Sequence, residues 1–191
     1  MTLFKKISIA CALIALLVFG FFMAVLTLFP LRYSVLIERY AQIYDHDPAF
    51  IAAVIHAESR FRHEAVSRAG AQGLMQITPT TGEWLAELLG IENFTNYQLF
   101  DVEINIRLGS FYLRNLLNNH DQNKRMALAA YNAGTGRVRS WLNDPQFSHD
   151  GKTLYHIPYG ETRTYIDRVL LNQRIYSVLY FLRSLVVRNT P

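Results

Sequence analysis

The chain has 191 residues, of which 51% are hydrophobic and 18% charged, with a net charge of +4 and an isoelectric point near 9.3. This length fits one compact domain with an appendage and excludes two large domains. The single cysteine, Cys11, excludes an intrachain disulfide and a cysteine-ligated metal site. The modest positive charge fits either ordinary surface charge or attraction to an anionic polymer, and it gives no reason to expect a nucleic-acid partner.

The first predicted element is an uncharged apolar segment over residues 7–29. As a helix it would extend about 34 Å, enough to cross a hydrocarbon core of about 30 Å. Its length and the absence of a small-residue cleavage pattern predict an uncleaved anchor over residues 1–30, with a cleaved signal peptide as the alternative. Lys5 and Lys6 favour a cytoplasmic N-terminus, whereas Arg32 and Arg39 on the other flank weaken that preference.

Beyond the anchor, the sequence predicts a mainly α-helical domain, because no sustained strand-like alternation is present. An amphipathic segment covers about residues 33–44. Asp47 and Pro48 then provide the N-cap and the first residue of a helix that ends near residue 59 or 60. A polar loop and a short turn through residues 74–77 follow, and Pro79 is expected to end this turn.

The later helices are predicted from their capping residues. Thr80 and Glu83 have the spacing of a capping box for a helix that closes at Gly90, and Asp101 is expected to cap the next one. Further helices are expected over residues 102–118, 124–133 and 161–187, with a short segment over 137–142 and a non-periodic stretch over 143–160. These elements predict a single helical domain over residues 31–191.

Glu58 occupies a position that should carry an apolar side chain. Ile51, Val54 and Ile55 lie at i, i+3 and i+4 of one helical stripe, and Glu58 follows at i+7. Burial disfavours the charged carboxylate, and the last turn of a helix repels an anion, so both effects raise the pKa of Glu58. A glutamate whose pKa rises from about 4.3 toward about 6 or above can act as a general acid near neutrality. The alternative is that the helix ends by residue 57 and Glu58 faces water.

Three segments accompany the pair Glu58-Ser59: GAQGLMQITPTT (residues 70–81), AYNAGTGRV (130–138) and IPYGETRTYIDRV (157–169). In order and separation, the four resemble the signature segments of the soluble lytic transglycosylase (SLT) family. Members of that family cleave the glycan strands of bacterial peptidoglycan with a lysozyme-like, mainly helical domain. The resemblance extends from about residue 33 to about residue 178, and it implies a domain of this fold and activity.

The resemblance also implies roles for individual residues. Glu58 would be the sole catalytic acid and then the base, and the phenol of Tyr165 would lie close to its carboxyl group. Taken by themselves, a tyrosine such as Tyr131 is more often a core aromatic than a ligand contact, and a methionine such as Met75 more often fills the core. Arg60 and Arg62 make the flank of Glu58 more basic than the family pattern. Substrate contacts are implied for Ser67, Met75, Gln76, Tyr131, Asn132 and Tyr165, and supporting roles for Ser59, Glu161 and Arg163.

Other chemistries lack their motifs. There is no HExxH sequence, because His56 and Glu58 are two residues apart and His63 lies beyond the expected helix end, so we expect no metal and no organic cofactor. No phosphate-binding loop or serine nucleophile elbow is present. Together with the apolar segment and its flanking lysines, the resemblance predicts a monomeric lytic transglycosylase of the bacterial inner membrane, single-pass, with its catalytic domain in the periplasm. It would cleave the MurNAc-GlcNAc β-1,4 bond of peptidoglycan strands non-hydrolytically, giving 1,6-anhydromuramyl ends. The alternatives are a lysozyme-type muramidase and a catalytically silent, membrane-tethered peptidoglycan-binding protein.

Overall fold

The chain divides into two compact units, Met1–Arg32 and Tyr33–Pro191. The computed structural model describes residues 3–188. The first unit is formed by helix α1 (Leu3–Leu28), in which Ile7–Leu28 is apolar and long enough to cross a membrane, judged by length and composition. The division falls after Arg32, whereas the sequence analysis placed it after residue 30.

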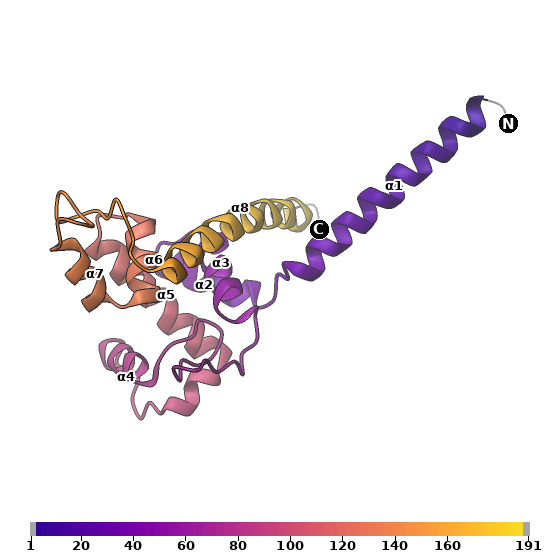
Figure 1. The fold of residues 1–191 in the computed structure, drawn as a ribbon. Coiled ribbons are helices and arrows are strands. Elements are labelled where there is room, and N and C mark those ends of the chain that lie inside the picture. Colours follow the sequence, from indigo (N-terminus) through magenta and orange to yellow (C-terminus); the bar gives the residue numbers. More distant parts are fainter. Residues whose placement is uncertain (1–2, 189–191) are drawn as a thin grey trace. The chain divides into compact units, whose positions relative to one another are not determined.

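The second unit is mainly helical, as the sequence predicts (Figure 1). Among the described residues, β-pairing is confined to isolated bridges within the loop that follows α3. The helices of this unit are α2 (Ser34–Ile43), α3 (Pro48–Ser59), α4 (Pro79–Leu88), the 3₁₀ helix η1 (Asn96–Phe100), α5 (Val102–Asn119), α6 (Lys124–Ala133), α7 (Thr135–Leu142) and α8 (Gly160–Arg188).

Helix α3 forms the centre of the core and packs most extensively against α8. Every residue from Ala49 to Ile55 is buried, so this helix has no solvent-facing side over its first two turns. The carboxylate of Asp47 accepts a hydrogen bond from the amide of Ala49 at 2.9 Å, which confirms the predicted N-cap. Packing against the core therefore holds α3 in place along its length. The position of its C-terminal turn, which carries Glu58, is fixed as a result.

Helix α4 begins earlier than the sequence analysis expected, and the capping box assigned to Thr80 and Glu83 is wrong. The N-cap is Thr78, whose hydroxyl accepts a hydrogen bond from the amide of Thr81 at 3.3 Å. Pro79 is the first helical residue rather than the end of a turn, because the first position of a helix needs no amide donor and suits the fixed φ of proline. The helix η1 was not predicted, since five residues are too few to show a helical period.

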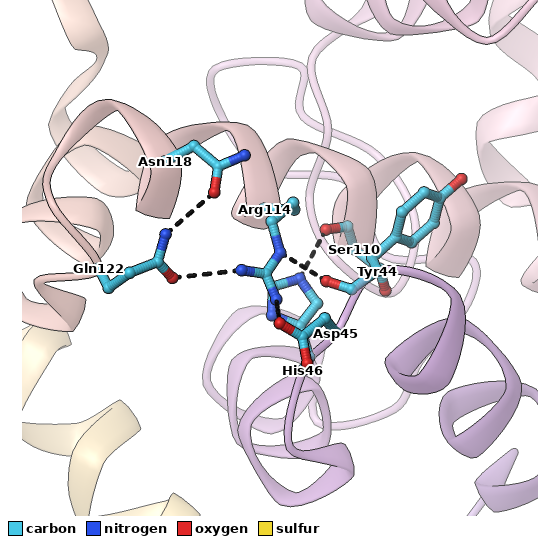
Figure 2. A network of polar contacts seen from close by, with 7 residues as sticks. All are labelled: Tyr44, Asp45, His46, Ser110, Arg114, Asn118 and Gln122. Carbon is cyan, nitrogen blue, oxygen red and sulfur yellow. Dashed lines mark hydrogen bonds and ion pairs between the residues drawn. The ribbon is translucent and has the colours of Figure 1, made fainter.

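Arg114 on α5 joins two distant turns of the second unit (Figure 2). Its Nε donates to the carbonyl of Tyr44 at 2.6 Å, and its terminal nitrogens contact the Asp45 carboxylate at 2.9 Å and Oε1 of Gln122 at 3.2 Å. Asp45 and Gln122 both have positive φ angles, of 52° and 60°, which non-glycine residues seldom adopt. The contacts of Arg114 therefore stabilise two strained turns, one before α3 and one between α5 and α6.

Replacing Arg114 with alanine is expected to lower the free energy of unfolding by about 1.5–3 kcal/mol, because charged hydrogen bonds to a carbonyl and an amide are lost. Asp45→Asn is the matched control. The Asp45 side chain is 98% exposed, so its ion pair contributes only about 0–1 kcal/mol. Urea unfolding of the full chain in detergent, followed by tryptophan fluorescence, measures both values. Equal losses for the two variants would assign the stabilisation to the ion pair and contradict the role of the other two contacts.

Candidate active site

Glu58 is the penultimate residue of α3, and the chain turns sharply just beyond it. Arg60 and Phe61 both have positive φ angles, of 52° and 62°. Phe61 is fully buried, and its ring packs against the rings of His56 and Tyr176 with centroid separations of 6.3 and 6.0 Å. Because α3 continues past residue 57 and its end is fixed by this packing, the reading of Glu58 as part of a frayed, water-facing helix end is excluded.

Two other helices contribute the side chains that surround the Glu58 carboxyl group. Tyr131 comes from α6, and Tyr165 and Arg168 come from α8. The Tyr165 hydroxyl is buried and lies near the carboxyl group, close enough to lower its pKa, although this contact falls short of full hydrogen-bond geometry. The guanidinium group of Arg168 lies 5.9 Å from the centroid of the Tyr165 ring. The structure thus brings together Glu58 and two of the predicted substrate-binding tyrosines.

The pKa of Glu58 is raised to about 7, mainly because burial disfavours its charged form. Part of the side chain remains accessible to solvent, yet the carboxyl group is withdrawn from water. The contact with Tyr165 and the charge of Arg168 act in the opposite direction and lower the pKa. Burial also raises the pKa of Tyr131 and Tyr165 well above 10, so both phenols stay neutral. The group can therefore donate a proton near neutral pH and then accept one, as expected from the sequence.

This shift makes folding stability depend on pH. Since the pKa of Glu58 rises from an ordinary 4.5 to about 7 on folding, the neutral form stabilises the fold below about pH 4.5. That stability is lost as the pH rises to about 7, and the total is at most about 3 kcal/mol. Glu58→Gln lacks this dependence. Its free energy of unfolding relative to the wild type should therefore increase by up to about 3 kcal/mol between about pH 4.5 and pH 8. Urea unfolding at several pH values measures it, and a constant difference would contradict the raised pKa.

A row of aromatic rings from three helices leads to the site. The Tyr131 hydroxyl donates to the carbonyl of Met75 at 2.6 Å, and the Tyr131 ring packs against Tyr112 of α5 with centroids 5.3 Å apart. Tyr112 meets Trp84 of α4 edge to face at 6.0 Å, and Trp84 is 45% exposed. The sequence analysis missed Trp84 and Tyr112 because they belong to no motif, and only the fold places them in line with Tyr131.

Met75 is a fully buried residue of this region. Its amide donates to Oδ1 of Asn105 at 2.8 Å, and its side chain packs against Gly109, where a Cβ atom would lie 2.3 Å from its sulfur. The Asn105 amide group also donates to the carbonyls of Leu99 at 2.7 Å and Gln72 at 3.1 Å. The Met75 side chain therefore has no surface to offer a ligand in this structure, which argues against the groove-lining role implied for it. Asn105, which the sequence analysis did not single out, holds the segment in place.

The loop after α3 is fixed by its own polar contacts. Gln76, at a φ of 50°, donates from Nε2 to the carbonyls of Ala65 at 3.0 Å and Gly73 at 2.9 Å. Its amide nitrogen is therefore used within the loop, and a hydrogen bond to substrate would fall to its Oε1. Ser67 is exposed, and its hydroxyl accepts from the amide of Ala71 at 3.0 Å. The contact of Ser67 with a reacting sugar stays a prediction.

The remaining predicted residues lie around the start of α8 and the end of α3. Asn132 of α6 accepts a hydrogen bond through Oδ1 from the buried hydroxyl of Thr162 at 2.8 Å, a partner that the sequence analysis missed. Arg163 donates to backbone carbonyls in the loop before α8, which fits its supporting role. Glu161 is exposed in the first turn of α8, where an anion complements the helix dipole. Ser59 is buried, and its hydroxyl donates to a carbonyl of the preceding turn at 3.2 Å.

A metal centre is not formed by the side chains of residues 3–188 that the structure describes, because no group of three or more His, Cys, Asp or Glu residues lies close enough together.

Comparisons with known sequences agree with the motif pattern. The family model described as the transglycosylase SLT domain matches residues 35–153. The soluble lytic murein transglycosylase of Salmonella typhimurium is 36% identical over 150 residues, which is 78% of this chain and 23% of that protein. The membrane-bound lytic murein transglycosylase C of Pectobacterium atrosepticum is 32% identical over 168 residues, covering 76% of this chain and 46% of the relative. The chain thus spans about a quarter of the length of the soluble relative.

Solved structures resemble the second unit in fold. An inactive glutamate-to-glutamine mutant of the lytic transglycosylase Slt from Pseudomonas aeruginosa superimposes with a TM-score of 0.70 at 35% identity, covering 80% of this chain and 25% of that one. The 70 kDa soluble lytic transglycosylase of Escherichia coli gives a TM-score of 0.69 at 33% identity, covering 81% of this chain and 25% of that one. The match of the family model to more than half of the chain confirms the resemblance seen in the motifs: this chain belongs to the transglycosylase SLT family.

Proposed function

We propose that this chain is a peptidoglycan lytic transglycosylase that cleaves the MurNAc-GlcNAc β-1,4 bond and leaves 1,6-anhydromuramyl ends. The observation that carries the proposal is the Glu58 carboxyl group, withdrawn from water beside Tyr131 and Tyr165 with a pKa of about 7, in a chain of the SLT family. A carboxyl group with this pKa is balanced between donating and accepting a proton at neutral pH, which a single acid and base requires.

In the proposed reaction, Glu58 first donates its proton to the bridging oxygen as the glycosidic bond breaks. The resulting carboxylate then accepts the proton of the 6-hydroxyl group of the muramyl sugar, whose oxygen bonds to the anomeric carbon. Glu58 ends protonated, as it began, and no water is consumed. The 6-hydroxyl group is held within the same sugar, so it has the effective concentration of an intramolecular nucleophile.

The environment of Glu58 favours this route over hydrolysis. Glycoside hydrolases usually need a second carboxylate as nucleophile or as base for water. Among the described residues, the groups that shift the pKa of Glu58 are Tyr165 and Arg168, and neither is a carboxylate. In this scheme the positive charge of Arg168 stabilises the Glu58 carboxylate after it has given up its proton, and the neutral phenol of Tyr165 orients it.

Substrate binding in this proposal uses the aromatic row and nearby polar groups. Sugar rings stack on aromatic faces, and Trp84, with nearly half of its surface exposed, begins a row that reaches Tyr131 beside Glu58. Oε1 of Gln76 and the amide of Asn132 would supply hydrogen bonds to sugar hydroxyl and acetamido groups. The inactivity of the glutamate-to-glutamine mutant of the P. aeruginosa relative shows that a glutamate is essential in that protein, which supports a catalytic role for a glutamate here.

We further propose that α1 anchors the chain in the bacterial inner membrane as a single span, with the second unit in the periplasm, acting as a monomer without a cofactor. The length and apolar composition of Ile7–Leu28 support the anchor, as does the membrane-bound class of one relative. Lys5 before the span supports a cytoplasmic N-terminus.

Digestion of purified peptidoglycan tests the proposed function. The full chain in detergent should release soluble muropeptides whose muramyl ends are one water lighter than those from a muramidase and resist reduction by borohydride. Chromatography with mass spectrometry identifies them, and Glu58→Gln serves as the control for contaminating enzymes. Binding without release would indicate a silent wall-binding protein, and reducible ends would indicate a muramidase.

A further inference from the structure

Helix α8 has a second apolar side in addition to the one that packs in the core. Its core side includes the buried Tyr165, Tyr176 and Leu179. A separate set recurs at i, i+4, i+7 and i+11, so these side chains form one stripe along the helix. This outer stripe consists of Leu171 (57% exposed), the half-buried Ile175, Val178 (57%) and Leu182 (40%), with Phe181 (60%) beside it.

Leu171, Val178 and Leu182 of the outer stripe are exposed, so they contribute little to the core of the second unit. Large apolar patches on monomeric soluble proteins are uncommon and mark surfaces that contact a protein or a membrane. The side chains concerned lie on the part of α8 beyond Tyr165, so they are separate from the catalytic surface. An occupant outside the unit is therefore needed to cover them.

Helix α2 lies beside the C-terminal turns of α8. Arg183 of α8 pairs with Glu38 of α2, which places the C-terminal turns of α8 beside the start of α2. Val35 lies one turn before Glu38 on the same side of α2 and is 64% exposed. Arg183 follows the buried Tyr176 and Leu179 at i+7 and i+4, so this pair places α2 on the core side of α8, and Val35 is an exposed apolar side chain separate from the outer stripe.

Chain connectivity points to a lipid surface as the occupant. Helix α1 ends at Leu28 and α2 begins at Ser34, so the link between them reaches at most about 20 Å. A unit tied this closely to a membrane-spanning helix has its α2 end held at the bilayer. The exposed Arg32 in the link and Arg174 beside the stripe supply positive charge for anionic headgroups.

We propose that the outer stripe of α8 is a membrane-contacting face that lies in the headgroup region of the bilayer. The stripe follows the helix axis, so α8 lies along the membrane surface with its core side facing away from it. Tyr165 is on that core side, which holds Glu58 roughly one helix diameter, about 10 Å, from the membrane. The enzyme would therefore act on the glycan strands nearest the membrane. This inference rests on the proposed anchor.

The spacing of the stripe would also suit a coiled coil with a second copy of the chain. A two-stranded seam would use the stripe of α8 alone and would leave Phe181, beside the stripe, exposed to water. A bilayer surface would cover both the stripe and Phe181. The short link to α1 keeps the second unit close to that surface.

Environment-sensitive fluorophores on single cysteines test the face in the full chain, reconstituted in vesicles of phosphatidylethanolamine and phosphatidylglycerol. The native Cys11 reports on the anchor. In a Cys11→Ser background, Leu182→Cys reports on the face, and Glu87→Cys on the exposed surface of α4 is the matched control. The Leu182 probe should show a blue-shifted emission that nitroxide-labelled lipids quench, whereas the Glu87 probe should behave as in water.

The results distinguish failure of the membrane-contacting face from failure of the α1 anchor. A Leu182 probe that resembles the Glu87 probe overturns the membrane-contacting face, and a quenched Cys11 probe in the same experiment shows that the anchor itself holds. A blue shift that lipid nitroxides do not quench, and that grows with the protein-to-lipid ratio, assigns the stripe to a second copy and also overturns the proposal. An unquenched Cys11 probe contradicts the anchor, and the membrane-contacting face falls with it because it rests on the anchor.

Discussion

Glu58→Gln is expected to lower the rate of muropeptide release by at least about 10³–10⁴-fold, the upper range for general acid–base catalysis, because one residue serves both proton transfers. The amide keeps the shape of the side chain but cannot transfer a proton. The fold should be retained or stabilised above pH 7, since a neutral group replaces an acid that burial disfavours. The initial rate of release from purified peptidoglycan measures the effect.

Glu64→Gln is the matched control for this prediction. Glu64 is an exposed acid in the loop that follows α3, and its loss should leave the rate within a few-fold of the wild type. A Glu58→Gln variant that retains near-normal turnover would remove Glu58 from the mechanism, and an equal loss in both variants would point to a general effect of negative charge.

Gly73→Ala is expected to destabilise the second unit by about 3–5 kcal/mol, through left-handed backbone strain combined with overpacking. The φ angle of Gly73 is +78°, and a Cβ atom there would lie 2.2 Å from the carbonyl oxygen of Leu99 and 2.2 Å from the Asn105 amide nitrogen. Rigid backbone and a buried side chain meet the new atom, so the loop that carries Met75 would have to move. Urea unfolding measures the loss.

Gly70→Ala separates the two causes. Gly70 has nearly the same φ angle, +80°, and no atom lies within 4 Å of the position of its Cβ. This variant should cost only the backbone strain, about 1–2 kcal/mol. Similar losses of stability at Gly70 and Gly73 would mean that the clash of the new Cβ atom at Gly73 with Leu99 and Asn105 does not add to the backbone strain.

The helices could be predicted where local chemistry determines them. Asp47 and Asp101 cap α3 and α5 as expected, because an N-cap needs only a side-chain oxygen next to the first free amides. Pro79 shows where prediction from local chemistry fails, because a proline can either end a turn or begin a helix. In this chain the Thr78 hydroxyl caps the helix, so Pro79 begins α4. The contacts of Arg114 join turns far apart in the sequence, so no local pattern indicates them.

The candidate site was predictable to different degrees. The burial of Glu58 follows from its place on an apolar stripe, and its raised pKa follows from that burial. The position of Tyr165 beside it depends on how α8 packs against α3, and only the family resemblance indicated it. Nothing in the sequence distinguishes Trp84 and Tyr112 from other aromatic residues. Their place in the site becomes visible only because α4, α5 and α6 bring their rings into a row with Tyr131.

Digestion in oxygen-18-labelled water most directly tests whether Glu58 acts alone and without water. In the proposed reaction the new bond at the anomeric carbon is formed by the 6-hydroxyl oxygen of the same sugar, so the anhydromuramyl products should contain no label. Mass spectrometry of the released muropeptides reads this at every cleaved end. Incorporation of one labelled oxygen per cleavage would show that water attacks the anomeric carbon, and would make the enzyme a muramidase.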